Sequence, residues 1–163
     1  MSAITYRALA VASAFGVAAS LLGYVVSFLG TPVDVVLPLW IPLCLGMIAL
    51  FVPIYVLEFP ASKSATFFWK GFARSMPRWV APCARLLTLL GLAHLVWYFI
   101  HGGLGAPAII DGQYVLDNRG RVLRVLTRSE YLMLKDDELR AFASMTLSFY
   151  FVPMTYWWFH RGS

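Results

Sequence analysis

Four long apolar stretches follow one another along the chain, separated by segments rich in charged and turn-forming residues. They cover residues 8–29, 33–57, 79–100 and 140–159. A helix of about 20 residues crosses the roughly 30 Å hydrocarbon core of a bilayer, so each stretch is long enough to span one. The pattern predicts an all-α integral membrane protein, in which a four-helix transmembrane bundle forms a single domain over residues 1–163.

The segment between the second and third apolar stretches predicts an amphipathic helix over residues 64–76. At about 100° per residue, its aromatic side chains fall on one side of the helix and Lys70, Arg74 and Arg78 on the other. A helix of this kind lies in the membrane interface with its aromatic side toward the lipid. We therefore expect these three basic residues to contact anionic headgroups, and a plain basic linker is the alternative.

The loop over residues 102–139, between the third and fourth stretches, predicts a small β-hairpin. Two β-prone runs, 113–116 and 121–126, flank residues 117–120, whose composition is typical of a turn. A hairpin of this size is only marginally stable alone, so it must rest on the bundle or on a partner. We expect it to be either a site of function or a lid over the helix ends.

A helix start follows the hairpin directly. Thr127 and Glu130 have the spacing of a capping box, in which each side chain bonds the backbone N–H of the other residue. The spacing predicts a helix that begins at Arg128 and continues into the fourth apolar stretch.

The first apolar stretch carries a row of small residues on one side. At about 100° per residue they share one sector of the helical wheel, and they are Ala12, Gly16, Ala19, Gly23, Ser27 and Gly30. Helices in lipid associate by close approach of their backbones, so small residues mark the contact face. We expect another helix of this chain to pack there, and a second copy or another membrane protein is the alternative.

Composition agrees with a bilayer environment. Apolar residues make up 60% of the chain and charged residues 13%, and the mean hydropathy is +0.72. Soluble domains carry about 25% charged residues. A soluble chain of this size buries on folding only about 70% of the surface that it exposes when unfolded. These values exclude a soluble enzyme and a disordered chain.

The distribution of basic residues predicts the orientation. The linker over residues 58–78 carries four basic residues offset only by Glu58, whereas the loop over residues 102–139 balances its basic residues with acids. Lysine and arginine accumulate on the cytoplasmic side, and an even number of spans puts both termini on that side. The net charge of +5 then reflects attraction to an anionic leaflet, and nucleic acid is not an expected partner because the charge is divided between two membrane surfaces.

Residues 111–116 and 126–131 resemble segments found in bacterial inner-membrane proteins. The resemblance implies that location for this chain and adds no mechanism.

Polar side chains on the third stretch are candidates for a site inside the membrane, because polar groups there are costly and often functional. They are Arg85, Thr88, His94, Tyr98 and His101. His94 and His101 lie about 10 Å apart along a helix, too far for one metal ion. We expect no metal, cofactor or catalytic residue.

Two functions are compatible with this pattern. The first is a non-catalytic membrane protein that acts through protein–protein contact, as an accessory subunit, an assembly factor or an immunity-like protein. The alternative is a membrane-embedded enzyme or small-solute carrier with a polar cavity around His94.

Overall fold

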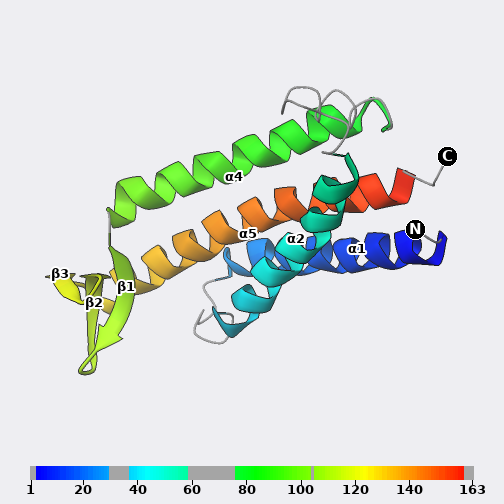
Figure 1. Cartoon of the computed structure of the whole chain (residues 1–163). Helices are drawn as coiled ribbons and strands as arrows, with labels where there is room; N and C mark the ends of the chain where they lie inside the picture. The colour runs from blue at the N-terminus through cyan, green and yellow to red at the C-terminus, as the bar shows by residue number, and fades with distance from the viewer. Residues whose placement is uncertain (1–2, 30–36, 59–75, 104, 160–163) are drawn as a thin grey trace.

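The computed structural model describes residues 3–29, 37–58, 76–103 and 105–159. In this part of the chain the order of elements is α1 (Ala3–Val26), α2 (Leu37–Glu58), α4 (Val80–Gly102), β1 (Ala106–Ile110), β2 (Gln113–Asn118), β3 (Arg121–Val125) and α5 (Arg128–Phe159). The protein is mostly helical with a small three-stranded sheet, as Figure 1 shows. The helical class and the hairpin were predicted correctly, and the third strand was not predicted.

Helix α5 is the central element. It packs along both α1 and α4 and runs in the opposite direction to them, while α2 crosses the group obliquely (Figure 1). The start of α1 and the end of α5 therefore lie at the same end of the molecule. At 1.5 Å per residue the 32 residues of α5 extend about 48 Å, well beyond the roughly 30 Å of a hydrocarbon core.

Two of the described helices are long and apolar enough to cross a membrane. They are α1 over Ile4–Val26 and α4 over Val80–Gly102, and α2 contains a shorter apolar segment, Ile41–Val56. The predicted second span begins four residues before α2, and residues 33–36 lie outside the described part of the chain. Most of the predicted interfacial helix, with Lys70 and Arg74, also lies outside it.

The contact face of α1 is turned away from the predicted one. Gly16, Gly23 and Ser27 are buried, but Ala12 and Ala19 are exposed, and Gly30 lies outside the described residues. No described helix of this chain covers the two alanines, and contact with a second copy or another membrane protein stays a prediction for them. Ser13 and Ser20 are buried instead, each with 0% exposure.

Most buried residues of α1, together with Ser27 just after it, follow a seven-residue period, and the buried Ala10 is an exception. Ser13, Ser20 and Ser27 are spaced by seven, and Gly16 and Gly23 lie between them with the same spacing. Ala12 and Ala19 are also seven residues apart, so this period does not distinguish them from Ser13 and Ser20. On a wheel at about 100° per residue the buried set is rotated by about 40° from the predicted sector, toward the two serines.

Tyr150 of α5 explains why glycine is needed in this face. A Cβ atom added to Gly16 would lie 2.0 Å from the Tyr150 ring. The Tyr150 hydroxyl donates a hydrogen bond to the carbonyl of Leu43, and a Cβ on Gly46 would lie 2.6 Å from that hydroxyl. One side chain of α5 thus fills space left by glycines of both α1 and α2.

Two tight turns connect the sheet. Strands β1, β2 and β3 pair antiparallel in that order, and the turns are Asp111–Gly112 and Arg119–Gly120. All four turn residues have positive φ, from 50° to 86°, as two-residue hairpin turns require. Asp-Gly is a strong hairpin signal, so the sequence contained the information that β1 precedes β2.

Candidate functional site

Arg85 and Thr88 line a groove between the first half of α4 and α5. Its volume is about 570 Å³. Its lining includes Ala81 and Ala84 of α4 and Val152 of α5. The small side chains at positions 81 and 84 leave the space open. Thr88 does not fill it, because its hydroxyl donates a 2.8 Å hydrogen bond back to the carbonyl of Ala84.

The groove carries positive charge. Arg78 also lines it, and both Arg78 and Arg85 are exposed. Among the described residues the groove lining contains no acidic side chain, and the ion pairs formed there involve neither arginine. The result is an apolar groove with two cationic side chains on its rim.

The five polar residues predicted on the third span do not form one site. His94 lies about 13 Å along α4 from Arg85 and meets the edge of the Tyr24 ring of α1, at 5.5 Å between ring centroids. Tyr98 is buried, and His101 is exposed and stacked on Trp97. The groove thus includes Arg85 and Thr88 but not His94, Tyr98 or His101, and a polar cavity around His94 stays a prediction.

A buried ionic cluster that sequence reasoning missed lies where α5 passes the end of α1. Arg140 donates to Asp137 at 2.8 Å and to the carbonyl of Ser27 at 3.1 Å, and its guanidinium lies 4.4 Å from the ring centroid of Phe28. The Asp137 side chain is only 7% exposed. A cation at the C-terminal end of a helix is favourable because the last carbonyls are unsatisfied. Arg140 therefore anchors α1 to α5.

A second ion pair lies two residues earlier on α5. Lys135 donates to Glu138 at 2.9 Å, and their side chains are 11% and 16% exposed. In each pair the two partners are three residues apart along the helix, a spacing at which side chains meet. That spacing was visible in the sequence, but the burial of the pairs was not.

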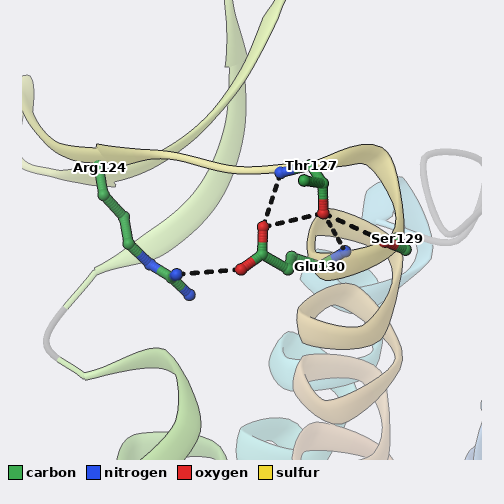
Figure 2. A network of polar contacts seen from close by, with 4 residues as sticks. All are labelled: Arg124, Thr127, Ser129 and Glu130. Atoms are coloured by element: carbon green, nitrogen blue, oxygen red, sulfur yellow. Dashed lines mark hydrogen bonds and ion pairs between the residues drawn. The ribbon is translucent and has the colours of Figure 1, made fainter.

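The predicted start of α5 at Arg128, next to the capping residue Thr127, is confirmed. Figure 2 shows the network of hydrogen bonds and ion pairs around it. The Thr127 N–H donates to Glu130 at 2.7 Å, and the Glu130 N–H donates to the Thr127 hydroxyl at 3.2 Å. Arg124 of β3 adds a 3.1 Å ion pair to the same carboxylate (Figure 2). The hydrogen bonds from Thr127, above all that from its backbone, hold the pKa of Glu130 below its ordinary value of 4.5. The network ties β3 to the first turn of α5.

This pKa shift predicts a loss of stability in acid. A carboxylate with a lowered pKa stabilises the folded state above its ordinary pKa, and this contribution disappears as the pH falls through the lower, folded-state value. We expect the difference in unfolding free energy between the wild type and Glu130→Gln to shrink from about pH 5 to about pH 2. Denaturant titrations followed by circular dichroism at each pH measure this difference.

The carboxyl of Asp136 does not affect this difference. Burial raises the pKa of its carboxyl, so its contribution to stability changes with pH in the opposite direction. It is present in both proteins and cancels in their difference. A difference that is constant from neutral pH to acid would contradict the role given to Glu130.

Strand β3 presents an edge that no described strand covers. The order of the sheet places β1 and β3 at its two edges, but Pro107 removes a backbone donor from β1. Strand β3 has neither proline nor glycine, and all five of its residues are exposed. Three of these are apolar, namely Val122, Leu123 and Val125. Such an edge is able to pair with an added strand.

The described residues contain no group of three or more His, Cys, Asp or Glu side chains that could hold a metal ion. Cys44 and Cys83 are free thiols.

No protein-family model matches the chain, and the comparisons with curated proteins and with solved structures found no match.

Proposed function

We propose that the chain is a multi-pass protein of the bacterial inner membrane that acts without catalysis, through contact with another protein. In this proposal α1, α2, α4 and the later part of α5 cross the bilayer as a four-helix bundle. Both termini face the cytoplasm, so the sheet lies on the opposite side. An accessory subunit, an assembly factor and an immunity-like protein all have this character.

Exposure of α4 supports the location in a membrane. Only 6% of its most apolar window is buried, whereas the core helix of a soluble protein is mostly buried. Large side chains such as Leu86, Val96 and Ile100 are more than half exposed on it. Lipid is the solvent in which such a surface is stable, because it is as apolar as the side chains.

The open edge of β3 carries the proposal of protein contact. It stands at the end of the bundle where α4 ends and α5 begins, beyond the apolar part of the helices (Figure 1). Its apolar side chains would be exposed to water there. A partner segment that added a strand would bond the unpaired backbone and cover Val122 and Val125.

Site-specific photo-crosslinking in native membranes tests this proposal. A photoreactive residue at Val122 or Val125 should give a discrete adduct with a second polypeptide. The same residue at Ile109 of β1 is the matched control, because Ile109 is also exposed but lies on the edge that contains Pro107. We expect little or no adduct from Ile109, since that edge is blunted.

Two outcomes would contradict the proposal. One is the absence of an adduct from β3, and the other is an equal yield from β3 and Ile109, which would indicate random collision. An adduct of twice 18.3 kDa would identify a second copy of the chain as the partner.

A further inference from the structure

We infer that the groove between α4 and α5 is a binding site for an acidic phospholipid, with Arg85 and Arg78 on its phosphate and an acyl chain along Ala81 and Ala84. The inference rests on the membrane location proposed above and is independent of the protein contact at β3.

The position of Arg85 on α4 fits a lipid headgroup. Trp79, at the start of α4, contacts the ring of Phe159 at the end of α5, with 6.2 Å between ring centroids. Aromatic residues of this kind mark the membrane interface. Arg85 lies six residues further along α4, about 9 Å deeper, and a long arginine side chain returns its charge to the interface from such a depth. Its guanidinium is thus placed at the level of lipid phosphates.

The charge of the groove selects the ligand. Arg78, in the turn before α4, and Arg85 of α4 both line the groove. Both are exposed, and the part of the groove lining that the structure describes contains no acid to neutralise them. Two guanidinium groups with free donors bind phosphate by charge-assisted hydrogen bonds.

The apolar part of the groove selects a lipid over a free anion. Apart from the arginines, its surface includes Ala81, Ala84 and Leu89 of α4 and Val152 of α5. Ala81 and Leu89 are exposed, so the groove opens sideways and a lipid can enter from the bilayer. A free phosphate ion would leave this apolar surface without a ligand.

Native mass spectrometry of the full chain from nanodiscs tests the inference. The nanodiscs contain equal amounts of phosphatidylglycerol and phosphatidylcholine, and the measured quantity is the ratio of the two lipids retained by the protein. We expect the wild type to retain phosphatidylglycerol preferentially. Arg85→Gln should lower the ratio about tenfold, because a charge-assisted contact is lost, and Arg85→Lys should keep part of it.

Two controls separate the groove from general charge attraction. Arg121→Gln removes an exposed arginine from β3 at the other end of the molecule and should leave the ratio unchanged. Ala81→Phe fills the groove while both arginines remain, and it should lower the ratio as Arg85→Gln does. Leu92→Phe, at another exposed position on α4, is its matched control.

Three results would overturn the inference. The first is an equal effect of Arg121→Gln and Arg85→Gln, and the second is an unchanged ratio in Ala81→Phe. The third is displacement of the lipid by millimolar inorganic phosphate, which would indicate a free-anion site. Alkaline extraction of the same protein tests its membrane location separately, so a failure of the groove and a failure of the proposed location are distinguishable.

Discussion

Arg140→Met is expected to lower the free energy of unfolding by about 3–5 kcal/mol, the usual effect of removing one partner from a buried ion pair. The substitution leaves the nearly buried Asp137 carboxylate without its 2.8 Å partner. It also removes the hydrogen bond from Arg140 to the carbonyl of Ser27, which joins α5 to the end of α1. Unfolding in mixed micelles with increasing sodium dodecyl sulfate, followed by circular dichroism, measures the change.

The exposed pair Arg124–Glu130 provides the matched control. Its side chains are 50% and 36% exposed, so Arg124→Met should cost less than about 1 kcal/mol. The double variant Arg140→Met with Asp137→Asn should recover part of the loss, because it no longer contains an unpaired carboxylate. If Arg140→Met cost no more than Arg124→Met, the anchoring role of Arg140 would be wrong.

Gly16→Val should destabilise the protein by about 3 kcal/mol, near the upper end of the usual cost of overpacking. The added side chain begins 2.0 Å from the Tyr150 ring and has no free space to enter. Tyr150 cannot swing away without breaking its hydrogen bond to Leu43. The same unfolding titration measures the effect.

Ala19→Val tests which side of α1 faces α5. Ala19 is exposed, so this substitution should change stability by no more than about 0.5 kcal/mol. It introduces the same side chain into the same helix, three residues from Gly16. A loss equal to that of Gly16→Val would instead favour the contact face first predicted from the helical wheel.

Features that depend on neighbouring residues could be predicted from the sequence. The start of α5 at Arg128 and the bonds between Thr127 and Glu130 follow from a three-residue spacing, because both partners belong to one turn of chain. The hairpin of β2 and β3 follows from a turn between β-prone runs. Strand β1 was missed although the Asp111–Gly112 turn that introduces it has a strong local signal.

The candidate sites depend on contacts between distant residues and could be predicted only in part. Arg85 and Thr88 were recognised as polar groups on an apolar helix, but the groove also needs Val152 of α5. Arg140 was recognised only as the edge of a span, because its contact with Ser27 joins residues 113 positions apart. No pattern within one helix indicates such a neighbour.

The sequence by itself determined that the chain forms long apolar helices, where α5 starts and that small residues of α1 form a contact face. The tertiary structure decided which of those residues are buried, which polar groups pair and where a cavity forms. The physical reason lies in what each interaction requires. Hydropathy and helix capping act within a few residues, whereas the side of α1 that buries Ser13, Ser20 and Ser27 is set by the place where α5 packs.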